Sequence, residues 1–149
     1  HDPDCWCGLI VDGRHVHPAT LQLALRTRRL ERFMLVTDAM PCVGSGQDTF
    51  LLQGRRIHVR DGVCVDDDGV LCGSALDMAG AVRNAMDLLR LPLEHAVAMA
   101  SAFPASFLGL DGERGRIAPG YRADLVVADE RMNVTQAWIG GDPPPQVFR

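Results

Sequence analysis

A short apolar run that ends on a carboxylate constrains the fold of this chain most strongly. Residues 35–39 read Leu-Val-Thr-Asp-Ala, and short continuous apolar runs are typical of parallel strands buried in an α/β sheet. Catalytic groups in such sheets lie at the carboxyl ends of the strands, so Asp38 occupies the position of a catalytic acid or base. Pro41, Gly44 and Gly46 follow and predict a loop. An aspartate that only caps or starts this turn is the alternative that the local pattern leaves open.

The segments around this run predict an α/β architecture. Residues 8–13 and 33–36 have the composition of buried strands, and residues 19–30 carry apolar side chains close to a helical period. A strand, a helix and a second strand in this order predict a parallel βαβ unit. Short β-rich runs with Gln-Gly and Asp-Gly turns between them follow, which predicts an antiparallel hairpin insertion near residues 48–66.

The second half of the chain predicts helices followed by strands. Residues 74–91 have apolar side chains every three or four positions, with Ser74 as a candidate N-cap and Asp77 as the acid of a capping box. Further elements are predicted as two short helices and then two strands, at residues 92–100, 104–109, 123–128 and 134–139.

Composition and cysteine content limit the class of protein. The 149 residues with a net charge of -4 predict one domain that binds neither nucleic acid nor an anionic membrane surface. No apolar run reaches the length of a membrane span. Five irregularly spaced cysteines indicate reduced thiols and a cytoplasmic location, and the single residue between Cys5 and Cys7 argues against a structural zinc. The chain opens without Met, so we expect a processed product, a fragment or a partial gene.

Two further clusters have residue types that could carry chemistry. His15 and His17 lie two positions apart on an extended segment, where they could share one face and bind a metal. One exposed and one hydrogen-bonded histidine is the alternative. Glycines in residues 69–74 would let the backbone approach a ligand, although an ordinary loop leading to a helix cap fits equally. No phosphate-binding glycine loop or nucleophile elbow occurs, which argues against a triad hydrolase.

Four motifs occur in an order that resembles a known family. They read Asp-Gly-Arg-His-Val, Leu-Val-Thr-Asp-Ala, Leu-Cys-Gly-Ser before a helix, and a long glycine-containing segment, at residues 12–16, 35–39, 71–74 and 115–127. The last is similar to the closing motif of the whole amidohydrolase superfamily. The ordered series resembles the C-terminal part of the N-acetylglucosamine-6-phosphate deacetylases, and it covers nearly the whole chain.

The resemblance implies the C-terminal portion of a (β/α)8 metal-dependent hydrolase barrel that carries a small β-sandwich. Residues 8–13 would be the seventh barrel strand and residues 33–38 the eighth. The implied domains are a partial barrel over residues 1–112, sandwich strands over residues 113–142 and a disordered tail over residues 143–149.

The resemblance also implies roles for individual residues. Asp38 would take a proton from a metal-bound water and pass it to the leaving amine. His15 would contact the substrate, and the backbone of Leu71, Cys72 and Gly73 would line the sugar site. The family commonly has Ser at the position of Cys72, a change that a backbone contact tolerates.

The implied cofactor is a divalent metal, zinc or similar, held by a glutamate and two histidines on earlier strands, upstream of this chain. No metal ligand is therefore carried over, and the resemblance assigns the histidine pair to the substrate side. The implied function is hydrolysis of N-acetylglucosamine 6-phosphate to glucosamine 6-phosphate and acetate, by a homodimer in amino-sugar catabolism, with this chain inactive alone. Alternatives are a non-catalytic truncated remnant that binds a sugar phosphate or a partner, and another amidohydrolase such as a cyclic-amide hydrolase.

Overall fold

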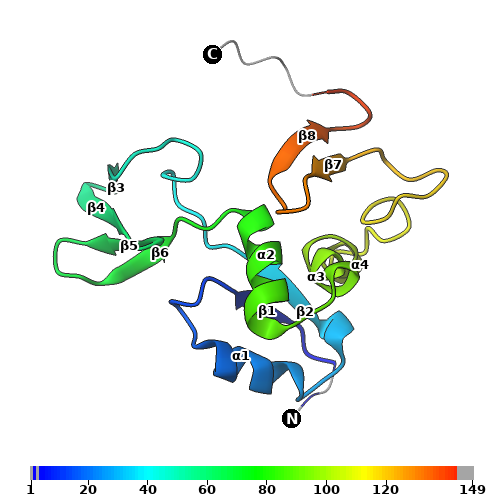
Figure 1. The fold of residues 1–149 in the computed structure, drawn as a ribbon, viewed down its shortest axis with the longest axis horizontal. Coiled ribbons are helices and arrows are strands. Elements are labelled where there is room, and N and C mark those ends of the chain that lie inside the picture. The colour runs from blue at the N-terminus through cyan, green and yellow to red at the C-terminus, as the bar shows by residue number, and fades with distance from the viewer. Residues whose placement is uncertain (1, 3, 144–149) are drawn as a thin grey trace.

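The computed structural model describes residue 2 and residues 4–143. Figure 1 shows α1–α4 gathered around strands β1 and β2, with the β3–β6 sheet and the β7–β8 hairpin standing apart from each other. The elements follow in chain order as β1 (Cys7–Ile10), α1 (Pro18–Leu25), a 3-10 turn (Leu30–Arg32), β2 (Phe33–Val36), β3 (Thr49–Leu52), β4 (Arg55–Arg60), β5 (Val63–Asp66), β6 (Leu71–Ser74), α2 (Met78–Leu89), α3 (Leu93–Ala100), α4 (Ala102–Phe107), β7 (Leu125–Ala128) and β8 (Val134–Trp138).

The predicted βαβ unit is confirmed. Strands β1 and β2 pair in parallel, with Cys7 opposite Phe33 and Ile10 opposite Val36. Helix α1 connects them and is shorter than predicted, because it ends at Leu25 and the chain continues through the 3-10 turn. Within the described residues neither strand has a second neighbour, so the outer edges of this two-stranded sheet are open.

The main core lies between this sheet and the helices. Leu9 and Val11 from the first strand segment and Phe33 and Leu35 from the second are buried, since alternate residues of each strand point to the same face. Helix α2 covers that face with small side chains, and α3 adds Met99, which is fully buried. Burying these side chains contributes the apolar stabilisation of this part of the chain.

Strands β3–β6 form an antiparallel sheet. Together with the loop that precedes it, this sheet has a core of its own, and we call the whole segment the arm (residues 39–74). The strands pair in chain order, β3-β4-β5-β6. Its core consists of Ile57, Cys64 and Cys42 with partly buried neighbours. The antiparallel excursion is therefore confirmed, and it gains a fourth strand at Leu71–Ser74, where a loop was the expected alternative.

The predicted cap of the long helix is wrong. Ser74 ends strand β6, and helix α2 begins at Met78 with Asp77 as its N-cap, whose side chain accepts a hydrogen bond from the Gly80 N–H. The Ser74 hydroxyl instead donates a hydrogen bond to the Thr37 carbonyl oxygen at 2.5 Å. The Ser74 side chain therefore bonds to the segment just past β2 and does not cap the helix.

The C-terminal hairpin contacts the rest of the molecule through its turn. Strands β7 and β8 pair antiparallel, and Val126 and Val134 on them are exposed. Met132, in the turn, packs against the main core, and its carbonyl oxygen accepts a hydrogen bond from Arg83 of α2 at 3.0 Å. Of the tail predicted for residues 143–149, residues 144–149 lie outside the described part. No helix in the described chain has the length and hydropathy needed to cross a bilayer.

Candidate functional site

Two carboxylates stand at the carboxyl edge of the β1–β2 sheet. Ile10 and Val36 are paired at the last register position. Asp12 and Asp38 each follow that pair by two residues, so the neighbouring parallel strands bring them to the same edge. Ligand-binding and catalytic groups of α/β proteins are found at such edges.

Asp38 is held by its backbone and leaves its carboxylate free. Its φ is +51°, a left-handed conformation that Asp adopts more readily than most residues. The Asp38 carbonyl oxygen accepts a hydrogen bond from the Ser74 N–H at 2.9 Å, and the Met40 N–H donates to the Ser74 carbonyl oxygen at 2.9 Å. Among the described residues no hydrogen bond reaches the Asp38 carboxylate. The side chain is exposed, so it does not serve as the turn cap that the sequence left open.

Gly73 packs directly against this ladder. Its φ of +127° is unfavourable for any residue with a side chain. A Cβ at this position would lie 2.7 Å from Met40 Cγ and 3.0 Å from the Asp38 carbonyl oxygen. Only glycine fits here, so the structure brings the predicted site residues Gly73 and Asp38 into contact.

His15 is held by Asp12 at the end of β1. The His15 ring nitrogen Nδ1 lies 2.6 Å from Asp12 Oδ2. The other oxygen of Asp12 accepts hydrogen bonds from the backbone N–H groups of Arg14 and His15, both at 2.9 Å. The turn between the two residues requires the left-handed Gly13, at φ +70°. Both side chains are shielded, with 5% of Asp12 and 12% of His15 exposed.

The surroundings of Asp12 favour its ionised form. Burial by itself raises the pKa of this carboxyl group, because it removes water from the charge. The hydrogen bonds from the Arg14 and His15 backbone and from the His15 ring outweigh burial, so the pKa of Asp12 is lowered. At neutral pH Asp12 is therefore a carboxylate that only accepts hydrogen bonds.

The two histidines have different partners. His17 is the N-cap of α1, where its Nδ1 accepts a hydrogen bond from the Ala19 N–H at 3.2 Å. His15 instead faces Asp12. Across the part of the chain that the structure describes, no group of three His, Cys, Asp or Glu side chains could hold a metal ion.

Leu71 and Cys72 lie on β6 with Gly73, but further from Asp38. Leu71 pairs with Val65 and is exposed. Cys72 is half-buried and packs against the core of the arm. Within the described residues neither of them hydrogen-bonds to His15, so the predicted site residues fall into two groups: Asp38 with Gly73, and His15 with Asp12.

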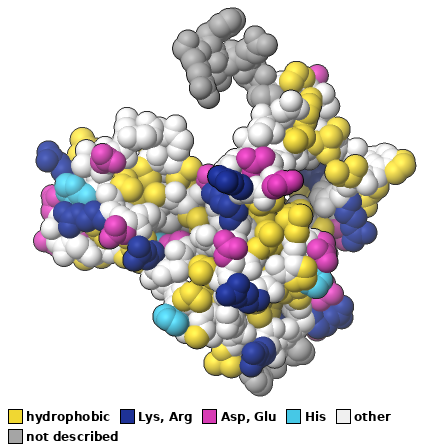
Figure 2. All heavy atoms as spheres, viewed as in Figure 1, with side chains coloured by type: hydrophobic (Ala, Val, Ile, Leu, Met, Phe, Trp, Pro, Cys, Tyr) yellow, Lys and Arg dark blue, Asp and Glu magenta, His cyan; other side chains and the backbone are white. Residues whose placement is uncertain are grey.

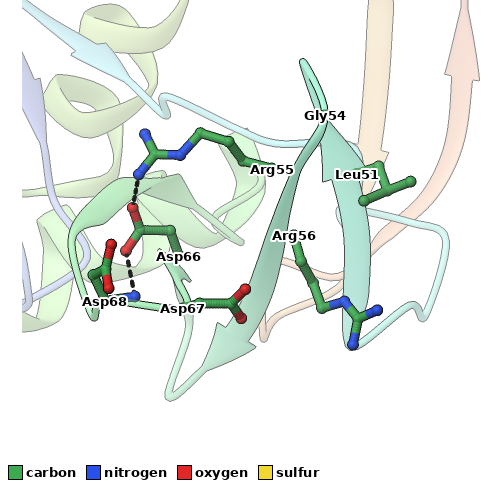
Figure 3. Close-up of a pocket in the computed structure, with 7 residues that line it drawn as sticks. All are labelled: Leu51, Gly54, Arg55, Arg56, Asp66, Asp67 and Asp68. Carbon is green, nitrogen blue, oxygen red and sulfur yellow. Dashed lines mark hydrogen bonds and ion pairs between the residues drawn. The ribbon is translucent and has the colours of Figure 1, made fainter.

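A shallow pocket of about 350 Å³ lies elsewhere, on the arm. Figure 3 shows the Arg55 side chain turned towards Asp66, across strands β4 and β5. The second Asp66 oxygen accepts hydrogen bonds from the backbone N–H groups of Asp68 and Val70. These hydrogen bonds stabilise the turn that shapes the pocket.

Sequence reasoning missed two residues that support the site. Asp12 stands in the quoted motif, and an Asp three positions before a His was the signal for its hydrogen bond. Asn84, on α2, donates from its side chain to the Val11 carbonyl oxygen at 2.7 Å. The sequence carries no signal for this bond, because it joins residues that meet only in the folded chain.

Comparison with known proteins identifies the family. The profile of the Amidohydrolase family matches residues 1–143. This chain belongs to that family. It is 40% identical over 140 residues to the putative N-acetylgalactosamine-6-phosphate deacetylase of Escherichia coli K12, covering 94% of this chain and 83% of that protein. It is 44% identical over 138 residues to the N-acetylgalactosamine-6-phosphate deacetylase of Shewanella sp. ANA-3, covering 92% of this chain and 34% of that protein.

Structural similarity agrees with the sequence. This amidohydrolase chain matches the crystal structure of N-acetylglucosamine-6-phosphate deacetylase from Pasteurella multocida with a TM-score of 0.89 at 33% identity, over 95% of this chain and 37% of that one. The chain thus spans most of one relative and about a third of the others named here. The predicted relationship to hexosamine-6-phosphate deacetylases is confirmed, and so is a mixed α/β fold that matches part of their structures.

Proposed function

We propose that this chain forms the C-terminal part of an enzyme that hydrolyses the N-acetyl group of an N-acetylhexosamine 6-phosphate. One observation carries the proposal. Asp38 and the Asp12–His15 pair lie at the same edge of the sheet, just past the ends of two neighbouring parallel strands. The resemblance to hexosamine-6-phosphate deacetylases supplies the reaction class.

In this proposal Asp38 is the catalytic acid and base. Its free carboxylate accepts a proton from the attacking water while the water oxygen bonds to the acetyl carbonyl carbon. The same proton then passes to the amide nitrogen, the C–N bond breaks, and acetate and the amino sugar phosphate leave. His15 contacts the substrate, and the backbone at Gly73, with Leu71 and Cys72 behind it, lines the sugar site.

Amidohydrolases are typically metal-dependent, and a bound divalent metal activates water and polarises the carbonyl group. The described residues do not fit such a metal, since they offer no cluster of three ligands. The roles given to Asp38 and His15 therefore do not depend on a metal held by this chain alone. Ligands on strands outside this chain stay part of the proposal, as does a homodimer.

The fold proposal follows from the open edges. Strands β1 and β2 would be the last two strands of a (β/α)8 barrel, within residues 1–112. The β7–β8 hairpin, within residues 113–142, would belong to a small sandwich. Exposed valines support further partners for these strands, because an isolated two-stranded hairpin is marginally stable.

The first substrate to test is the galactosamine derivative. Relatives named for the galactosamine derivative are 40–44% identical to this chain, whereas relatives named for the glucosamine derivative are 26–35% identical. N-acetylglucosamine 6-phosphate, which the sequence motifs suggested, is the second.

The test is acetate release by the longest open reading frame that contains this chain, with added zinc and each of the two sugar phosphates. We expect Asp38→Asn to lower kcat on the order of 10²–10⁴-fold, the usual contribution of a general acid–base group. Asp48→Asn changes an exposed aspartate in the loop before β3 and is the matched control. No acetate from either substrate, with an intact frame and bound metal, would contradict the proposal.

A non-catalytic remnant is the second candidate. One observation favours it: the E. coli K12 relative is itself short enough for this chain to cover 83% of it. An upstream frame without metal-ligand residues would support this candidate, and activity with cyclic amides in a substrate panel would instead indicate another amidohydrolase.

A further inference from the structure

The protonation of the His15 ring decides what this histidine can offer a ligand. A neutral imidazole carries its proton on one nitrogen and accepts a hydrogen bond on the other. Distances alone do not locate the proton, so the assignment must come from the partners of each nitrogen. For His15 the partner of Nδ1 is Asp12, at 2.6 Å.

Asp12 can only accept hydrogen bonds at this site. Its Oδ1 is occupied by two donors, the N–H groups of Arg14 and His15. Its Oδ2 faces His15 Nδ1 and belongs to an ionised carboxylate with no proton to give. The proton between the two groups therefore sits on Nδ1, because two acceptors without a proton would repel each other.

The position of Asp12 is fixed from two sides. The Gly13 turn sets the spacing between Asp12 and the His15 backbone. On the other side, Asn84 of α2 bonds to the carbonyl oxygen of Val11, the residue directly before Asp12. With its own carboxylate in three hydrogen bonds, Asp12 has no freedom to turn away from the ring.

We propose that Asp12 is a positioning residue that holds His15 as the Nδ1–H tautomer and so presents Nε2 as a hydrogen-bond acceptor. Among the described residues no partner occupies Nε2. A lone pair at Nε2 suits a sugar hydroxyl group, which has a proton to donate, and does not suit a phosphate dianion, which has none. This inference rests on the proposed function only for the identity of that ligand.

Asp12→Asn is the decisive variant because the backbone orients the new amide. The amide oxygen keeps the place of Oδ1, where the Arg14 and His15 N–H groups require an acceptor. The amide nitrogen then replaces Oδ2 and must donate to Nδ1. We expect the ring proton to move to Nε2, the change of tautomer that an Asp-to-Asn substitution causes in the serine protease triad.

The measurement is the long-range ¹⁵N–¹H correlation of the imidazole nitrogens in the full 149-residue chain, labelled at histidine and recorded where the rings are neutral. The signals of His15 are identified by their loss in His15→Gln. We expect a protonated Nδ1 in the wild type and a protonated Nε2 in Asp12→Asn. The backbone amide signals of Arg14 and His15 report whether the variant keeps its turn.

The arm supplies a matched control. His58 Nε2 lies 2.6 Å from Asp67 Oδ1, the same distance between the same residue types. Asp67→Asn should change the His58 signals and leave those of His15 unchanged. A wild-type His15 with its proton on Nε2 overturns the inference, even if Asp12→Asn does not fold, and so does a folded variant that keeps the Nδ1–H form. A failed deacetylase assay changes none of these readings, because the tautomer is read from the ring itself.

Discussion

The carbonyl oxygen of Asp38 accepts a hydrogen bond from the N–H of Ser74, at 2.9 Å, across the base of the arm. This bond and its return partner, from the Met40 N–H to the Ser74 carbonyl oxygen, join the end of β2 to the end of β6. The backbone that carries the proposed catalytic carboxylate is thus held by the strand that closes the arm. Figure 2 shows basic and acidic side chains interspersed over the visible face, so charge does not single out one region there.

Gly73→Ala should strain this junction. The new Cβ would lie 2.7 Å from Met40 Cγ and 3.0 Å from the Asp38 carbonyl oxygen, at a φ of +127°. We expect a loss of about 2–5 kcal/mol in the free energy of unfolding, from backbone strain and overpacking together. Urea denaturation followed by circular dichroism measures it.

Gly69→Ala is the control for this substitution. Its φ is +80°, but no atom lies within 4 Å of the added Cβ. We expect only the left-handed backbone cost, about 1–2 kcal/mol. Equal losses for the two variants would show that the contact between Gly73 and Asp38 does not matter.

Asp12 should make stability depend on pH in acid. Because its pKa is lowered in the folded chain, the unfolded state takes up the proton first as pH falls. The stabilisation by Asp12 is therefore complete above about pH 4, the range of an unfolded Asp, and is lost as pH falls through the lower folded pKa. In thermal melts from pH 6 to pH 2, the melting temperature of Asp12→Asn should fall less steeply with pH than that of the wild type.

Asp67→Asn again provides the comparison. The His58 hydrogen bond lowers the pKa of Asp67 as well, but this carboxylate is exposed to solvent, which screens the interaction. The melting temperature of Asp67→Asn should therefore fall with pH almost as it does for the wild type. A large change in the acid dependence of stability for Asp67→Asn, with none for Asp12→Asn, would contradict this prediction.

Cys42 and Cys64 should be unreactive in the folded chain. Their Sγ atoms are 3.5 Å apart in the arm core, and burial together with the Cys42 thiol raises the pKa of Cys64 to about 12. Thiolates are the reactive form, so exposed Cys5 should be alkylated first. Mass spectrometry after brief iodoacetamide treatment checks this, and unfolding in urea should release the two buried thiols.

The same shift predicts a loss of stability in base. Between about pH 9 and pH 12 the unfolded chain releases the Cys64 proton while the folded chain keeps it, so the unfolded state binds fewer protons. Stability should therefore fall as pH rises over this range. Cys64→Ala should flatten that slope; an unchanged slope would assign it to other groups.

Arg83→Ala should loosen the C-terminal hairpin. Its guanidinium donates to the Met132 carbonyl oxygen at 3.0 Å, and losing one such bond costs about 1 kcal/mol. Hydrogen exchange should become faster in β7 and β8 but not in β1 and β2. Arg116→Ala, at an exposed position, should leave exchange unchanged.

Local patterns predicted the strands and their pairing better than the helix ends. The apolar run before Asp38 matched β2, and Asp-Gly turns indicated the arm, because both signals act over a few residues. The start of α2 was misplaced because Ser74 and Asp77 both have the chemistry of a cap. Asp77 caps the helix, whereas Ser74 bonds to Thr37, a neighbour that the sequence does not reveal.

In the candidate site too, local motifs predicted single residues, but the contacts between distant residues were not predicted. Asp38 and His15 were predicted from motifs, and Gly73 from its place in one. The contact of Gly73 with Met40, and the bond from Asn84 to Val11, join residues on different elements. Such long-range contacts depend on the folded topology, and no periodicity or spacing in the chain encodes them.

The ladder at the base of the arm also has a consequence for how such chains can change. The arm leaves the sheet after Asp38 and returns at Ser74 beside it, and it carries its own core. A segment that departs from and rejoins the scaffold at one point is a module: it can be shortened, extended or exchanged between relatives while the carboxylate at its entry keeps its coordinates. Variation in that module would therefore leave the backbone at Asp38, the proposed acid and base, where it is.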